Sequence, residues 1–221
     1  MRLGSGYPVA ALAVVLAVAA VMLVPSRSDQ AWFLMRDVNP MAALSAAEAA
    51  RAEAPSDERA ARVLALIQMH LGDMDAAGST LRERVEISGG APGAIHELAR
   101  HHVSMGRPRE AIELFLTLPA ISLSPDEQLY VAGWLRANRD VAGELGFLSE
   151  LWREGGLDSA GAHRYAALLA ASGDRSTSVS VYRTLDGNGA LLDPVARLQF
   201  QTLLQQAGHT EEAARRVAEW R

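Results

Sequence analysis

The chain has 221 residues and a formal net charge of −5, and hydrophobic residues make up 49% of it but aromatic residues only 5%. This mild, dispersed acidity argues against a nucleic-acid binder with a concentrated basic face, and the absence of cysteine excludes disulfides, thiolate metal sites and cysteine nucleophiles. Much of the hydrophobic content is Ala and Leu, which are strong helix formers. Composition therefore predicts an all-α fold.

An uninterrupted apolar run, VAALAVVLAVAAVMLV, occupies residues 9–24 between Pro8 and Pro25. Its length approaches what a helix rising about 1.5 Å per residue needs to cross roughly 30 Å of hydrocarbon. A cleaved signal peptide, whose apolar core is usually about 7–15 residues long, is the alternative. We expect residues 1–25 to be a retained transmembrane anchor and residues 26–39 to be a juxtamembrane linker.

The orientation of this segment is not set by its flanking charges. Arg2 precedes the run, and Arg27 and Arg36 follow it, so the bias of Lys and Arg between the two sides hardly discriminates. Bacterial N-terminal anchors that precede helical-repeat domains often have a short cytoplasmic tail and an exported domain. By this analogy we expect a single-pass protein of the bacterial inner membrane with a periplasmic repeat domain.

After a lone helix expected over Pro40–Ala54, four glycines recur at nearly regular spacing. Gly72 and Gly106 are 34 residues apart, Gly173 and Gly208 are 35 apart, and the interval between the two pairs is 67, or two further units. Each glycine separates two amphipathic stretches of about a dozen residues. Because glycine readily adopts the left-handed conformation that ends a helix, the pattern predicts helix–turn–helix units.

This spacing resembles the tetratricopeptide repeat (TPR) family. The second unit carries the resemblance best: Ala99 and Ala111 are the small residues at repeat positions 8 and 20, Gly106 stands at position 15, and Phe115 is the large residue at position 24. The resemblance covers residues 40–221 and implies a right-handed superhelical solenoid of about five helical hairpins. The units are expected to start at or near Glu58, Pro92, Pro125, Ser159 and Pro194.

Two units depart from the family pattern. In the third unit, Arg139 replaces the glycine at position 15 and Glu144 replaces the small residue at position 20. In the fifth unit, Gln201 stands where a small residue is expected. The family's tryptophan at position 4 does not occur in any unit, so the sequence predicts a degenerate repeat array.

No motif in the sequence indicates catalysis. His96-Glu97 and His101 resemble a zinc-protease helix, but the second histidine is five residues after the first and not four, so the imidazoles diverge around the helix. The glycine-rich stretches do not form phosphate loops, and no serine stands in a G-x-S-x-G elbow. We expect no catalytic residue, no metal site and no cofactor.

The resemblance also implies a concave groove, which the first helices of the repeats line through positions 2, 5, 9 and 12. At these positions the sequence has several Arg and His and one acidic residue, Asp126. The groove residues expected to bind a ligand are Arg59, Arg62, Met69, His96, Arg100, Arg136 and His163.

Together these features favour a non-enzymatic, membrane-anchored scaffold or adaptor that binds protein subunits of a bacterial envelope assembly or secretion complex. One span followed by degenerate repeats is weakly similar to the N-terminal part of Pel-type exopolysaccharide export proteins, which suggests exopolysaccharide secretion. The alternative function is binding of an acidic peptide or an anionic glycan in the basic groove. A homo-oligomeric structural element is a third hypothesis, and no nucleic acid is expected as a partner.

Overall fold

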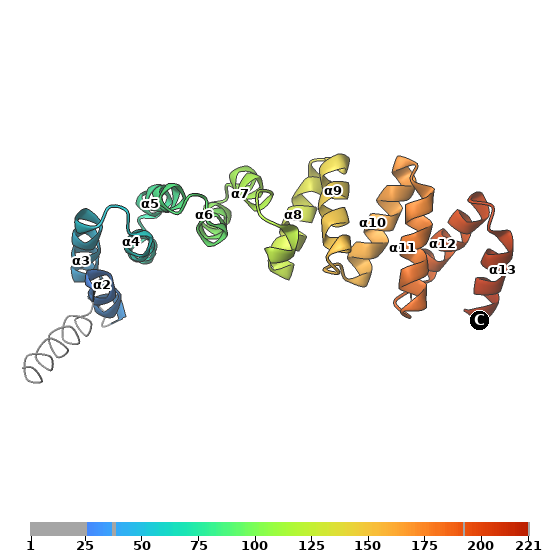
Figure 1. Ribbon diagram of the computed structural model, residues 1–221, viewed down its shortest axis with the longest axis horizontal. Coiled ribbons are helices and arrows are strands. Elements are labelled where there is room, and N and C mark those ends of the chain that lie inside the picture. The colour runs from blue at the N-terminus through green and yellow to red at the C-terminus, as the bar shows by residue number, and fades with distance from the viewer. Residues whose placement is uncertain (1–25, 37–38, 192, 221) are drawn as a thin grey trace, which may run out of the picture. The chain divides into compact units, whose positions relative to one another are not determined.

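The computed structural model describes residues 26–36, 39–191 and 193–220 (Figure 1). These residues form twelve α-helices and one 3-10 helix, and no strand occurs among them. The all-α fold class predicted from composition is therefore confirmed.

The chain divides into two compact units, the first ending at Leu114 and the second beginning at Phe115. The first unit contains α2 (Arg27–Arg36), α3 (Pro40–Glu53), α4 (Glu58–His70), α5 (Met74–Ile87), α6 (Pro92–Ser104) and α7 (Pro108–Phe115), which ends at the boundary. The second unit contains η1 (Ala120–Ser122), α8 (Pro125–Ala137), α9 (Val141–Arg153), α10 (Ser159–Ser172), α11 (Arg175–Gly187), α12 (Pro194–Gln206) and α13 (Thr210–Glu219).

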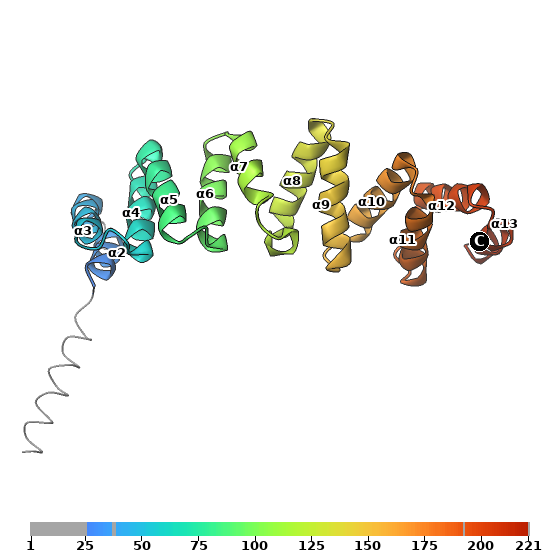
Figure 2. The same ribbon diagram turned by 45° about the horizontal axis from the view of Figure 1, so that its top comes forward.

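The predicted hairpins are confirmed, and their first helices begin at the five residues that the sequence indicated. Helices α4, α6, α8, α10 and α12 each start a pair whose second member follows after a short turn. Figure 2 shows this alternation within the second unit, where α8 lies beside α9 and α10 lies beside α11. The repeats are thus TPR-like helical hairpins.

Short polar residues fix where these helices begin. A capping side chain accepts a hydrogen bond from a backbone N–H of the first turn, which otherwise lacks a partner. Ser124 and Glu127 form a reciprocal capping box before α8. The aspartates that cap α4, α5, α9, α10, α11 and α12 are Asp57, Asp73, Asp140, Asp158, Asp174 and Asp193.

The turn inside each hairpin uses a residue with positive φ. Gly72, Gly106, Gly173 and Gly208 have φ values of +82°, +65°, +96° and +82°. In the third hairpin Arg139 takes this place with a φ of +58°, and among the described residues it is the one non-glycine residue with a positive φ. The turn geometry is therefore kept even where glycine is lost, at the cost of strain in the backbone.

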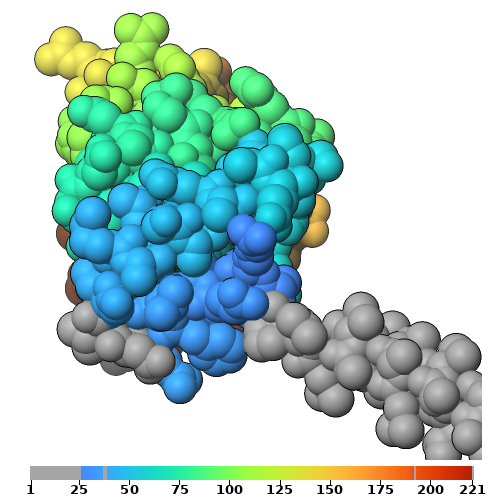
Figure 3. All heavy atoms as spheres, turned by 90° about the vertical axis from the view of Figure 1, so that its left-hand side faces the viewer, coloured from blue at the N-terminus to red at the C-terminus, as the bar shows by residue number. Residues whose placement is uncertain are grey.

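The segment expected to be a linker contains a helix. Helix α2 packs against both α3 and α4, and Ala31 on its inner face is fully buried together with Ala43 of α3. Small side chains at this contact let the two helices approach closely. The helix that the sequence predicted as a lone cap, α3, is therefore one half of a hairpin, and Figure 3 shows α2 and α3 packed together at this end of the first unit.

Each unit has its own apolar core. In the first unit Ala65, Leu81 and Leu98 pack together from α4, α5 and α6. In the second unit Tyr182 of α11 stacks on Phe200 of α12 with ring centroids 5.5 Å apart, and both side chains are fully buried. Consecutive hairpins thus bury the apolar faces that a single hairpin would leave open.

Within the described ranges, no helix is both long and apolar enough to cross a membrane. The apolar run at residues 9–24, which the sequence predicts to be an anchor, lies outside the residues that the structure describes.

Candidate binding cleft

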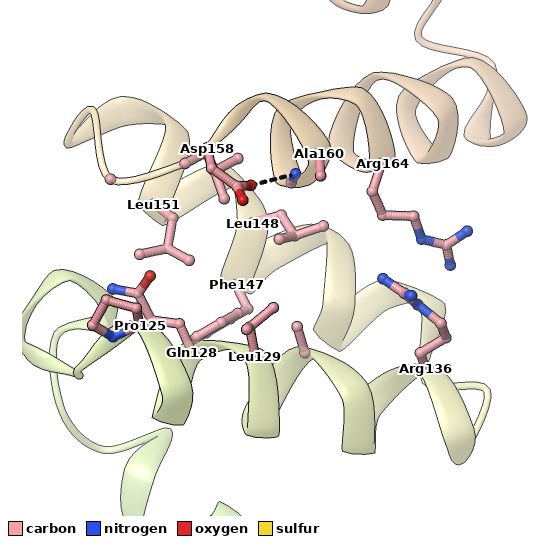
Figure 4. Close-up of a pocket in the computed structure, with 14 residues that line it drawn as sticks. Pro125, Gln128, Leu129, Arg136, Phe147, Leu148, Leu151, Asp158, Ala160 and Arg164 are labelled. Carbon is pink, nitrogen blue, oxygen red and sulfur yellow. Dashed lines mark hydrogen bonds between the residues drawn. The ribbon is translucent and has the colours of Figure 1, made fainter. Parts of the chain in front are cut away.

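A cleft of about 440 Å³ opens in the second unit between α8 and α10, with α9 behind it (Figure 4). All three helices contribute to its walls. Its lining residues are Pro125, Gln128, Leu129, Ala132 and Arg136 from α8, Phe147, Leu148 and Leu151 from α9, and Gly156, Leu157, Asp158, Ala160, Gly161 and Arg164 from α10 and the turn before it.

The middle of the cleft is apolar. Leu129 projects from α8 with 71% of its surface exposed, and the largely buried side chains of Phe147, Leu148 and Leu151 line the cleft from α9. Transfer of an apolar side chain from water into this part of the cleft is favourable by roughly 25 cal/mol of free energy per Å² of apolar surface buried. This part of the surface is therefore suited to an apolar group of a partner.

One end of the cleft carries a cluster of three charges. Glu144 of α9 is only 1% exposed and accepts hydrogen bonds from both arginines that line the cleft. Arg164 donates from Nε to Oε1 at 2.9 Å and from Nη2 to Oε2 at 2.6 Å, whereas Arg136 donates from Nε to Oε1 at 3.1 Å. Figure 4 shows Arg136 and Arg164 side by side at this end.

The hydrogen bonds from Arg164, supported by Arg136, hold the pKa of the Glu144 carboxyl below its usual value, although burial acts in the opposite direction. The same contact raises the pKa of the Arg164 guanidinium. Glu144 is therefore ionised at neutral pH. The cluster of two guanidiniums and one carboxylate carries a net charge of +1.

The cleft accompanies the departure of the third hairpin from the repeat pattern. At the position of Glu144 the other hairpins have a small buried residue, namely Ala77, Ala111, Ser178 or Ala213. On the facing helix, Ala132 is partly exposed and lines the cleft, whereas its counterparts Ala65, Ala99 and Ala166 are fully buried. The space beside Ala132 on α8 therefore stays open, whereas the space beside its buried counterparts is filled by neighbouring helices.

In the first unit, two of the predicted groove arginines lie beside carboxylates. Arg59 of α4 pairs with Asp29 of α2, and the Nε of Arg62 lies 2.8 Å from a carboxylate oxygen of Glu97 on α6. Glu97 also pairs with the buried Arg84 of α5. These ion pairs join neighbouring helices and partly neutralise the surface for which the sequence predicted a basic groove.

The other predicted groove residues lie on α4, α6 and α10. Met69 on α4 and His96 on α6 are partly buried, and Arg100 on α6 is exposed. His163 on α10 shares a 2.8 Å hydrogen bond with Oε1 of Gln199 on α12. Of the seven predicted residues, Arg136 is the one that lines the cleft.

The contacts of Glu144 with Arg136 and Arg164 were not predicted from the sequence. Glu144 stood out as a charged residue at a helix-packing position, and a buried carboxylate needs cationic partners. That need does not identify the partner, because Arg164 follows 20 residues later in another hairpin and its proximity depends on how the hairpins stack.

The described part of the chain offers no group of three or more His, Asp or Glu residues that could hold a metal ion. Glu97, from the motif that resembles a zinc-protease helix, is paired with Arg62 and Arg84. His101 of the same motif is buried against Gly78 of α5.

Sequence comparison finds no matching family model and no matching curated protein. Similar solved structures include a chain in the structure of Naa15/Naa10 bound to HypK-THB, at 18% identity and a TM-score of 0.55 over 85% of this chain and 29% of that chain. A tetratricopeptide repeat protein from Parabacteroides merdae matches at 13% identity and a TM-score of 0.50 over 87% of this chain and 77% of that chain. These two likenesses show the TPR-like fold.

Proposed function

We propose that this chain is a non-enzymatic scaffold, anchored in a bacterial inner membrane, which binds a partner protein in the cleft between α8 and α10. The observation that carries the proposal is the cleft itself, where the exposed Leu129 stands beside an apolar floor and a cationic end. A site with an apolar centre and a few polar groups at its edge is typical of a binding surface. The apolar lining favours a protein segment over an anionic glycan.

Two features support the membrane anchor. The apolar run at residues 9–24 has the composition of a membrane span, and α2 begins at Arg27, three residues beyond the end of that run. Trp32 and Phe33 on α2 are 43% and 46% exposed. Three residues reach at most about 10 Å, so an embedded run would hold the start of α2 near the membrane surface, where exposed aromatic side chains are favoured.

An anchored array of helical hairpins is suited to holding subunits of an envelope machine beside the membrane. We place the repeat units on the periplasmic side and the protein in an envelope assembly or secretion system, of which exopolysaccharide secretion is the specific case that the chain layout favours. The proposal assigns no catalytic step to any residue.

Site-specific photo-crosslinking in native membranes tests this proposal. The chain contains no lysine, so amine-reactive reagents would find no side chain on it. A photo-reactive amino acid in place of Leu129 probes the cleft, and the same amino acid in place of Val141, which is 50% exposed on α9 but does not line the cleft, is the matched control.

We expect the probe at position 129 to capture one reproducible envelope protein that the probe at position 141 does not capture. Equal capture by both probes, or capture by neither under conditions that preserve a control complex, would contradict the proposal that the cleft holds a partner.

A further inference from the structure

We infer that the cleft recognises a protein segment presenting a large apolar side chain and a carboxylate separated by about two helical turns. This inference rests on the proposed function, because it assumes that a protein segment occupies the cleft. It specifies the chemistry of that segment from the arrangement of Leu129, Arg136, Arg164 and Glu144.

The spacing comes from α8. Leu129 and Arg136 are seven residues apart on this helix, which places them on nearly the same face and about 10 Å apart along the axis. Figure 4 shows both facing the same cleft, with Leu148 and Leu151 across from Leu129 and with Arg164 beside Arg136. A bound helix would match this spacing with side chains seven residues apart. An extended strand would not, because side chains three residues apart point to opposite faces of the strand.

Arg136 is the residue that would bind the carboxylate. Arg164 is held to Glu144 by two hydrogen bonds, whereas Arg136 reaches Glu144 through Nε and keeps 56% of its side chain exposed. The terminal nitrogens of a guanidinium can still donate to a carboxylate while Nε is engaged. Glu144 and Arg164 are positioning residues, which fix the orientation of Arg136.

Charge complementarity supports a single carboxylate at this end. The cluster has one unbalanced positive charge, so one ligand carboxylate neutralises it, and a ligand ammonium would be repelled. At the other end of the cleft, the Asp158 carboxylate accepts a 2.7 Å hydrogen bond from the Gly161 backbone N–H and caps α10. The two ends of the cleft therefore have opposite charge. A segment with one carboxylate would bind with that carboxylate at the arginine end, which fixes the direction of its chain.

Peptide probes of fixed composition test the inference. Each probe is a fluorescein-labelled, alanine-based peptide with one Phe and one Glu at separations of two to eight residues, and a second series has Lys in place of Glu. Binding is measured by fluorescence anisotropy with the full chain in nanodiscs. The variant Arg136→Glu reverses the charge at the cleft, and Arg153→Glu, an exposed change on α9 away from the cleft lining, is its control.

We expect the Glu peptides to bind best at a separation of seven residues. Arg136→Glu should weaken their binding about tenfold and should strengthen binding of the matching Lys peptide, whereas Arg153→Glu should change neither. The inference is overturned if binding ignores the separation, or if Arg136→Glu and Arg153→Glu have the same effect. In that case a partner crosslinked at position 129 would still support the proposed function.

Discussion

The third and fourth hairpins, α8/α9 and α10/α11, belong to the same unit and follow the same plan, yet they differ at the turn residue and at the residue where the two helices pack together. The fourth hairpin turns at Gly173 and has the buried Ser178 at the helix contact, where its hydroxyl donates to the Ala166 carbonyl at 2.8 Å. The third turns at the strained Arg139 and has the buried Glu144 at that contact. The comparison shows that the fold tolerates these costs where it opens a cleft, as expected if strain and buried charge gather at functional sites.

Among these changes, replacing the buried carboxylate of Glu144 should have the largest effect on the free energy of unfolding. We expect Glu144→Ala to lower the free energy of unfolding by about 2 kcal/mol, because both arginines lose their partner but still reach water. Urea unfolding of the full chain in nonionic detergent, followed by far-UV circular dichroism, measures it. Ser178→Ala, the matched change in the fourth hairpin, should cost less, and equal losses would remove the distinction between the two hairpins.

Lowering the pH should reduce the contribution of Glu144 to the free energy of unfolding and leave the contribution of Ser178 unchanged. The pKa of Glu144 is lower in the folded protein than the ordinary value of 4.5, so its carboxylate stabilises the fold above pH 4.5 and loses this effect as the pH falls through the folded value. The difference in unfolding free energy between the wild type and Glu144→Gln should therefore shrink below pH 4.5. A difference that stays constant down to pH 3 would contradict the ion-pair assignment.

A smaller effect is expected at the turns. Arg139→Gly should raise the free energy of unfolding by about 1 kcal/mol, since glycine adopts a positive φ without strain. The matched change Gly173→Ala should lower it by about 1 kcal/mol through the backbone alone, because an added Cβ would meet no atom within 4 Å. Thermal melts of both variants check the signs, and destabilisation by Arg139→Gly would show that the arginine side chain contributes more than its backbone costs.

The hairpins were predictable because their signals are local. A glycine between two amphipathic stretches, repeated at about 34 residues, locates the first helix of a unit, and Pro92, Pro125 and Pro194 mark helix starts that the structure confirms. Helix α2 was missed because its inner face rests on small residues such as Ala31, which give no strong apolar stripe.

Less of the candidate site could be predicted from the sequence. Arg136 was predicted to be a groove residue, and Glu144 was noted as a departure, but the sequence does not show that they meet. Arg59 and Arg62 were predicted to be groove residues, but the sequence does not show that Asp29 and Glu97 lie beside them. Such pairs join different hairpins, so they depend on the stacking geometry, which repeat spacing alone does not specify.

The most direct test of the scaffold account is quantitative copurification from native membranes with two matched surface variants, Leu129→Glu and Val141→Glu. Both residues are exposed and lie in the third hairpin, but Leu129 alone of the two lines the cleft. We expect Leu129→Glu to lose the bound partner and Val141→Glu to retain it at the wild-type level. Equal recovery of the partner by both variants would contradict the claim that this cleft is the binding site.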